Sequence, residues 1–234
     1  PSWSSAASDV YKRQNNKNLV IRVDMNVPIK DGNILDSTRI EASLPTIEYA
    51  LKNNAKILLI SHLGRPIEGE YEESFSLKPV AKYLSKIVNE PCNVIDDLDS
   101  KSFFNKESNI QLLENIRFFD GEKANCKDLG AKLASLGDIY VFDAFGTAHR
   151  EQASTHSAIE CAPIACAGLL LQRENKFLSL ALNNHESPYV AVIGGAKVSS
   201  KLELIKHINS EADHIIVGGG IANTFLKAKG FDVG

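Results

Sequence analysis

The sequence predicts an α/β protein: a Rossmann-like, doubly wound parallel sheet, followed by the start of a second α/β domain. From Leu19 onward, short apolar runs alternate with amphipathic stretches, as in repeated strand–helix units. Several runs are apolar almost throughout, which is typical of strands covered on both faces. The alternation pauses in a long helical stretch and begins again at Tyr189, which indicates a second domain.

The elements of the first domain follow from the spacing of apolar residues. A turn is expected at Asp31-Gly32, and Pro45 is tolerable because it lies near the start of its helix. Strands are expected over 19–23, 56–60, 93–95, 110–113 and 139–142, and helices over 39–53, 77–89 and 123–136.

The rest of the chain is expected to hold a connecting helix and about two strand–helix units. Helical spacing extends over 165–183. Strands are then expected over 189–193 and 214–217, with helices over 202–208 and from the glycine run 218–220 to Ala228.

We therefore expect four segments. Residues 1–14 are Ser- and Ala-rich and are predicted to be a non-native or disordered leader; a well-packed Trp3 would contradict this. The first domain is placed at 15–168, the connecting helix at 169–186, and the start of a second, truncated domain at 187–234.

Composition excludes several classes of function. The 26 basic and 29 acidic residues give a net charge of −3, so no overall basic surface predicts a nucleic-acid or membrane partner. The 4 cysteines lack zinc or disulfide spacing, which favours a reducing cytoplasm and predicts no metal site. No apolar run approaches the roughly 18 residues that span a bilayer.

The stretch GGAKVSSK, residues 194–201, predicts an anion site between a strand and a helix. Its glycines allow close backbone approach, and exposed amides at a helix start favour a phosphate. Lys197 and Lys201 lie four residues apart and could both reach that anion. The alternative is an ordinary turn with two solvated lysines.

Cationic residues also gather after the expected strands. Of the 7 arginines, three follow a strand directly and a fourth opens the first helix. Parallel strands bring these positions to one edge of the sheet, where we expect a cationic crevice for a small polyanion. For any single arginine the alternative is a surface salt bridge. The residues expected at this edge are Asp24, Asn26, Arg39, His62, Arg65, Arg117 and Arg150.

Seven short stretches resemble those of phosphoglycerate kinases, bacterial ones most closely. In order along 18–234 they are RVDMN, STRI, SHLGRP, LLENIRF, DAFGTAHR, GGAKVSSK and VGGGIANTFL. The resemblance implies a glycolytic kinase that transfers a phosphoryl group between 1,3-bisphosphoglycerate and ADP, giving 3-phosphoglycerate and ATP. It further implies Mg2+ with the nucleotide, a monomer, and a cytoplasmic location.

The resemblance also implies roles for particular residues. Arg39 and Lys197 match catalytic positions, and Lys197 and Lys201 match nucleotide-phosphate contacts. Gly218 and Gly219 match backbone near the adenine. The phosphoglycerate contacts implied are Asp24, Asn26, Arg39, His62, Arg65, Arg117 and Arg150. Segment 15–168 would then bind phosphoglycerate, and 187–234 would begin the nucleotide domain.

A dehydrogenase and an inactive fragment are the two alternatives to this kinase. A dehydrogenase shares the fold class, but the glycine run 218–220 has Asn223 where a dinucleotide fingerprint needs its third glycine. Neither glycine stretch has the GK[ST] ending of a Walker A motif. Because members of the family are longer than this chain, the remaining alternative is an inactive fragment that binds 3-phosphoglycerate.

Overall fold

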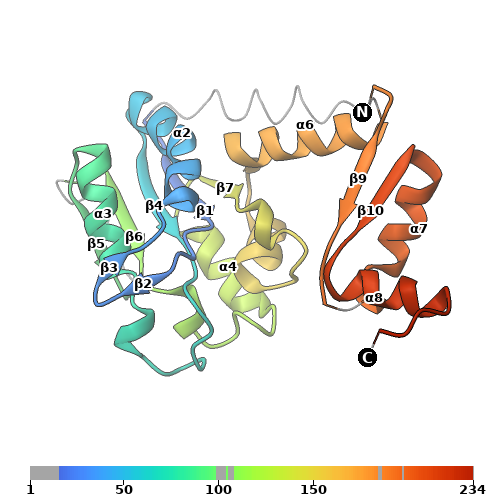
Figure 1. Cartoon of the computed structure of the whole chain (residues 1–234). Coiled ribbons are helices and arrows are strands. Elements are labelled where there is room, and N and C mark those ends of the chain that lie inside the picture. The colour runs from blue at the N-terminus through green and yellow to red at the C-terminus, as the bar shows by residue number, and fades with distance from the viewer. Residues whose placement is uncertain (1–15, 99–103, 105–107, 184–185, 197, 234) are drawn as a thin grey trace. The chain divides into compact units, whose positions relative to one another are not determined.

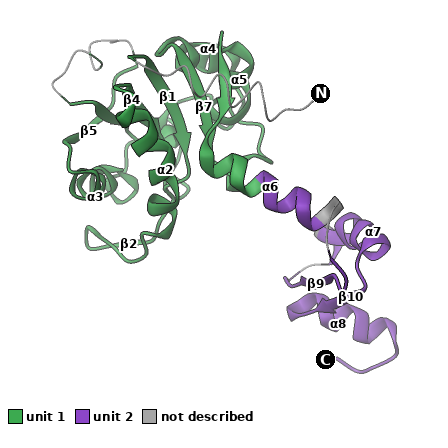
Figure 2. Cartoon of the chain, turned by 90° about the horizontal axis from the view of Figure 1, so that it is seen from above, with its two compact units in different colours: residues 1–174 green, residues 175–234 purple. Residues whose placement is uncertain are grey.

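The computed structural model describes residues 16–98, 104, 108–183, 186–196 and 198–233 (Figure 1). The chain divides into two compact units, residues 1–174 and 175–234 (Figure 2). The expected leader over 1–14, with Trp3, lies outside the described residues. The domain boundaries expected from the sequence stay predictions.

The first unit is built on a six-stranded sheet in the order β5-β6-β4-β1-β7-β8. Every neighbouring pair in it is parallel, as the alternating pattern predicted. The fold class is therefore confirmed. The strands are β1 (Asn18–Val23), β4 (Lys56–Ile60), β5 (Cys92–Ile95), β6 (Ile110–Leu113), β7 (Ile139–Asp143) and β8 (Ala165–Ala167).

Helices cover both faces of this sheet (Figure 1). Successive residues of β1 point to opposite faces, so Leu19 and Ile21 belong to one core and Val20 to the other. The first core packs against α2 and α3, and the second against α4 and α5. The helices of this unit are α2 (Thr38–Lys52), α3 (Lys78–Val88), α4 (Lys127–Ser135), α5 (Ala158–Cys161) and the start of α6 (Leu169–Asn183).

Short elements lie in the loops that follow several strands. The turn predicted at Asp31-Gly32 joins β2 (Ile29–Lys30) to β3 (Asn33–Ile34), and both turn residues have positive φ, 51° and 73°. Further short elements among the described residues are η1 (Glu73–Phe75), η3 (Ile116–Phe118), η4 (Phe145–Thr147) and a π-helical turn, η5 (Ala153–Ser157).

The helix expected over 165–183 was wrong at its first residues. Ala165 to Ala167 form β8, which pairs with Tyr140 to Phe142 at the edge of the sheet. Small residues fit either element, and pairing with β7 decides between them. Gly168 follows the strand, and the helix begins at Leu169.

The helix expected from residue 123 begins at Lys127 instead. Asn125 has a φ of 54° and Gly121 a φ of 92°, both outside the α-helical region. Residues 121–125 therefore form turns. The sequence also gave no sign of η5 and α5, which the structure places in the Ser- and Thr-rich stretch after Arg150.

The second unit contains a two-stranded parallel sheet with helical elements after each strand. Its strands are β9 (Val190–Ile193) and β10 (His214–Val217); its helices are a 3-10 turn, η6 (Ser199–Lys201), then α7 (Leu202–Glu211) and α8 (Gly219–Ala228). A small core joins Ala191 and Ile193 to Ile205, Ile208 and Ile221. Alternate strand residues are exposed, Val192 by 74% and Ile216 by 55%.

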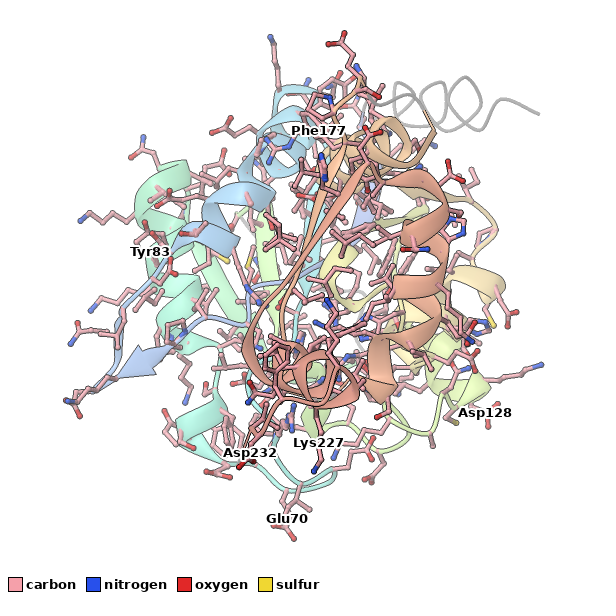
Figure 3. All side chains as sticks on the ribbon, turned by 45° about the vertical axis from the view of Figure 1, so that its right-hand side comes forward. Glu70, Tyr83, Asp128, Phe177, Lys227 and Asp232 are labelled. Carbon is pink, nitrogen blue, oxygen red and sulfur yellow. The ribbon has the colours of Figure 1, made fainter. Side chains whose placement is uncertain are left out.

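Charged side chains stand on the outside of both units. Examples are Asp128 in the first turn of α4 and Lys227 in the last turn of α8 (Figure 3). Within the described ranges, every helix is too short or too polar to cross a membrane.

Candidate functional site

The polar residues predicted at the sheet edge follow four neighbouring strands. β6, β4, β1 and β7 are adjacent and parallel, so the loops after them meet at one edge. Asp24 and Asn26 follow β1, His62 and Arg65 follow β4, Arg117 lies in η3 after β6, and Arg150 follows β7.

Asp24 links the loop after β1 to the start of α2. Arg39, in the first turn of α2, donates a hydrogen bond from Nη1 to Asp24 Oδ2 at 2.8 Å. The other carboxylate oxygen of Asp24 accepts a bond from the backbone of Asn26 at 3.2 Å. The Arg39 side chain remains 55% exposed, so its other guanidinium donors can reach a ligand.

Gly64 joins three of these loops. Its amide donates to Asn26 Oδ1 at 2.9 Å, and its carbonyl accepts a bond from Arg117 Nη1. Its φ is 58°, and a Cβ here would lie 2.2 Å from the Phe75 ring. Glycine is therefore required both for the backbone conformation and for space.

Asn115 is a structural residue of this site that the sequence reasoning did not single out, although it lies in the quoted stretch LLENIRF. It is fully buried. Its amide nitrogen donates to the carbonyls of Leu63 and Phe75 at 2.7 and 2.9 Å. Its oxygen accepts from the amides of Leu63 and Arg117 at 3.2 and 3.1 Å. One side chain thus holds the loop of His62 and the turn of Arg117 together.

His62 lies among the positive charges of this edge. It is only 4% exposed. Burial, followed by the positive charges of Arg22, Arg117, Arg150 and Arg39, lowers the pKa of His62 to about 2. The imidazole is therefore neutral at physiological pH, and four arginines lie close enough to act on it.

Arg117 experiences the same crowding of positive charge. Burial, then the charges of Arg150 and Arg22 and more weakly Arg65, lowers the pKa of Arg117, while Glu122 opposes the shift. Arg117 is 5% exposed, and its Nε has no hydrogen-bond partner in the part of the chain that the structure describes. A buried donor without an acceptor is costly, so an anion here would be stabilised.

The structure thus brings together the cationic residues predicted at this edge, and adds Arg22. This arginine lies in β1, is 1% exposed, and donates to Ser154 Oγ at 2.9 Å. Ser154 Oγ in turn donates to the buried carboxylate of Glu122 at 2.6 Å. A charge inside the otherwise apolar run of β1 was the sequence signal that could have identified Arg22.

The second unit brings its two glycine stretches together. The amide of Gly218 donates to the carbonyl of Ile193 at 2.9 Å, and that of Ile221 to the carbonyl of Gly195 at 3.1 Å. A Cβ at Gly220 would lie 2.6 Å from the carbonyl oxygen of Ala196. Glycine is needed here for close approach, and Gly218 and Gly219 begin α8 beside the first stretch.

The two lysines of GGAKVSSK differ in what the structure shows. Lys201 ends η6, and its ammonium donates to the carbonyl of Gly194. Lys197 lies outside the described residues. The four-residue spacing of the two lysines on one helix thus has no support, because α7 begins only at Leu202.

Among the described residues, no group of three or more His, Cys, Asp or Glu side chains could hold a metal ion. The carboxylates near the cationic edge are engaged: Asp24 by Arg39 and Glu122 by Ser154. These residues do not form a Mg2+ site by themselves.

The fold and this edge define the class: an α/β protein with positive charge concentrated at the carboxyl ends of its parallel strands. The sequence model of the phosphoglycerate kinase family matches residues 9–234. The chain therefore belongs to the phosphoglycerate kinase family.

Individual relatives support the same family assignment. A phosphoglycerate kinase of Francisella tularensis subsp. novicida is 51% identical over 219 residues, which are 93% of this chain and 55% of the relative. One from Desulfovibrio desulfuricans is 51% identical over 218 residues, 93% of this chain and 56% of the relative.

Two solved structures share the fold. The phosphoglycerate kinase of Coxiella burnetii has a TM-score of 0.82 and 47% identity, and covers 94% of this chain and 56% of its own. That of Pyrococcus horikoshii has a TM-score of 0.80 and 34% identity, and covers 94% of this chain and 57% of its own. The chain spans little more than half the length of the relatives it matches.

Proposed function

We propose that the chain carries the phosphoglycerate-binding part of a glycolytic phosphoglycerate kinase. The reaction is reversible phosphoryl transfer from 1,3-bisphosphoglycerate to ADP, which gives 3-phosphoglycerate and ATP. The observation that supports it best is the gathering of Arg22, Arg39, Arg117 and Arg150 near the buried His62. In addition, Nε of Arg117 has no hydrogen-bond partner among the described residues. We place the protein in the cytoplasm as a monomer, without nucleic-acid or membrane partners.

The substrate would bind with its charged groups on this edge. His62, Arg65, Arg117 and Arg150 would bind the 3-phosphate, since guanidinium groups match phosphate geometry. Arg39 would bind the carboxyl or acyl-phosphate end, where its exposed side chain has free donors. Asp24 and Asn26 would hold the hydroxyl group.

The nucleotide would bind to the second unit. Lys201, Gly218 and Gly219 would contact ADP or ATP, whose phosphates carry Mg2+. Lys197 would follow the transferring phosphoryl group. Amides at the start of α8 and the glycine turn after β9 suit phosphate oxygens.

The chemistry needs no general base. The attacking atom is a phosphate oxygen in one direction and a carboxylate in the other, and both are ionised at neutral pH. Catalysis of such a transfer rests on positioning and on neutralising the negative charge of the phosphoryl oxygens. The site accordingly offers arginines, a neutral histidine and backbone amides.

Calorimetry with 3-phosphoglycerate tests the proposal. Binding should weaken with added salt, because ions screen the attraction between charges. Arg39→Ala should weaken binding about tenfold to a hundredfold, since a hydrogen bond to a charged group contributes about 1.5–3 kcal/mol. Arg173→Ala is the matched control, because Arg173 is exposed on α6.

Two results would contradict the phosphoglycerate site. One is a folded sample that binds no 3-phosphoglycerate at low salt. The other is an Arg39→Ala variant, with an unchanged circular dichroism spectrum, that binds as tightly as the wild type. An equal loss of affinity in Arg173→Ala would show that binding depends on the overall charge of the protein and not on Arg39 itself.

A second candidate is that this chain binds phosphoglycerate without turnover. The exposed sheet of the second unit favours this candidate. Parallel sheets are normally covered on both faces, but this sheet has two strands and leaves Val192 74% and Ile216 55% exposed. The chain also spans 55% of a relative's length.

We expect this chain to form ATP from 1,3-bisphosphoglycerate and ADP at close to the background rate in a coupled assay. Fusing it to the remaining sequence of a relative should restore turnover. Binding of 3-phosphoglycerate by the same sample, measured by calorimetry, shows that the first unit is competent. Robust turnover by the 234-residue chain alone would refute the second candidate and leave the first standing.

A further inference from the structure

We propose that Arg22 positions His62 by holding its ring as the neutral form with the hydrogen on Nε2, so that Nε2 donates to a phosphate oxygen. The donor role rests on the proposed function. Arg22 Nη2 lies 3.3 Å from His62 Nδ1, and both side chains are buried. A guanidinium has only donors, so Nδ1 must accept and cannot carry the hydrogen. The hydrogen of the neutral ring then lies on Nε2.

The neighbouring carboxylate does not offer the other arrangement. Asp24 Oδ1 is 3.9 Å from His62 Nδ1, which is too long for a hydrogen bond. The same carboxylate accepts from Arg39 and from the amide of Asn26. A hydrogen on Nδ1 would therefore face the donors of Arg22 without an acceptor in hydrogen-bond range.

Arg22 is itself held in place by a buried network. Its Nε donates to Ser154 Oγ at 2.9 Å, and its Nη1 donates to the carbonyl of Val23. Ser154 is fixed because its hydroxyl and its amide donate to the two oxygens of Glu122, at 2.6 and 2.9 Å. All three guanidinium nitrogens thus have partners, and the third faces His62.

Ser154 lies in the π-helical turn η5, which positions it. Tyr140, the second residue of β7, donates its hydroxyl to the carbonyl of Ser154 at 2.6 Å. Glu122 is fully buried, and burial raises its pKa while the charge of Arg22 opposes the rise. π-Helical turns are rare and are frequently found at functional sites. Here the turn connects Glu122 to Arg22, and so to His62.

Burial and the surrounding positive charges keep the ring of His62 neutral. Burial and the nearby arginines lower the pKa of His62 to about 2. The charged groups that face it are Arg22 on β1, Asp24 in the following loop, Arg39 in α2, Arg117 in η3 and Arg150 before η5. In the described part of the chain Nε2 makes no hydrogen bond. With its hydrogen there it attracts an anion, whereas the other tautomer would present a lone pair.

Long-range 1H–15N NMR of the ligand-free chain tests the arrangement, with His62 assigned by the loss of its signals in His62→Gln. We expect Nε2 to carry the hydrogen, Nδ1 to show the shift of an unprotonated acceptor, and neither to titrate between about pH 5 and 8. A hydrogen on Nδ1, or protonation of the ring within that range, would overturn the proposal.

Variants of Arg22 test whether this residue positions His62. In Arg22→Met, His62 should titrate at least one pH unit higher and populate both tautomers, and 3-phosphoglycerate should bind about tenfold more weakly. Arg22→Lys, which keeps a donor facing Nδ1, should restore the single tautomer with its hydrogen on Nε2. Arg173→Met, at an exposed arginine, should change neither property. If His62 in Arg22→Met behaves as in the wild type, Arg22 does not position it. The wild-type spectrum decides the tautomer even if Arg22→Met fails to fold.

Titration with 3-phosphoglycerate separates this proposal from the proposed function. The Nε2 signal should shift on binding while its hydrogen remains. If His62 carries its hydrogen on Nε2 but 3-phosphoglycerate does not bind, the proposed function fails and the tautomer assignment stands. If 3-phosphoglycerate binds to a ring with its hydrogen on Nδ1, the function stands and the positioning role of Arg22 is refuted.

Discussion

Asn115→Ala should lower the free energy of unfolding of the first unit by about 4 kcal/mol and abolish measurable binding of 3-phosphoglycerate. The substitution removes the side-chain partner of four backbone groups: the buried amide and carbonyl of Leu63, the buried amide of Arg117 and the half-buried carbonyl of Phe75. Each unsatisfied buried group costs about 1–3 kcal/mol, less where water enters the space. Because these groups belong to the loops of His62 and Arg117, the site should lose its geometry with them.

Urea unfolding followed by circular dichroism measures the stability, and calorimetry measures the binding. Asn109→Ala is the control, since Asn109 is exposed and, among the described residues, its side chain makes one long bond, to Glu90 at 3.3 Å. That control should change stability by less than about 0.5 kcal/mol. An Asn115→Ala variant within 1 kcal/mol of the wild type, or one that binds normally, would show that the bonds of Asn115 do not hold the site.

Asp143→Ala should lower the free energy of unfolding by about 3 kcal/mol, with the loss centred on the start of α6. Asp143 is fully buried at the end of β7 and accepts from the amide of Leu171 at 2.9 Å and from the hydroxyl of Thr46. Thr46 in turn accepts from the amide of Leu169 at 3.0 Å. Two first-turn amides of α6 therefore depend on Asp143 and Thr46. A carboxylate at the start of a helix also interacts favourably with the helix dipole.

Hydrogen exchange of the amides of Leu169 and Leu171 locates the effect, because both should lose protection in Asp143→Ala. Asp143→Asn should be milder, since an amide oxygen can still accept from Leu171. Asp128→Ala, at an exposed first-turn residue of α4 (Figure 3), should cost at most about 1 kcal/mol. Unchanged exchange at α6 would show that the helix does not need the carboxylate of Asp143.

Most of the sheet could be predicted because its strands are apolar almost throughout. β4 and β6 have the bounds expected from their runs, and β1 differs by one residue. The convergence of the loops also followed from the sequence, since parallel strands place their carboxyl ends at one edge. The proximity of His62 to Arg117 and Arg150 is the geometric result of that rule.

Other features had no local signal. Ala165 to Ala167 have no strand pattern of their own, and only pairing with β7 makes them β8. The role of Asn115 depends on carbonyls contributed by segments that are distant in the sequence, at Leu63 and Phe75. A motif can mark such a residue but cannot show which backbone groups surround it.

The sequence by itself determined the α/β class, the family, and which loops carry the positive charge, because apolar periodicity and strand direction are local properties. Only the tertiary structure decided how that charge is organised. It buried Arg22 beside His62, tied Arg22 through Ser154 to Glu122, and left Nε of Arg117 unpartnered within the described chain. The reason is physical: hydrogen bonding and burial depend on which distant residues come into contact, and the packing of β1 against β4 and β7 fixes those contacts.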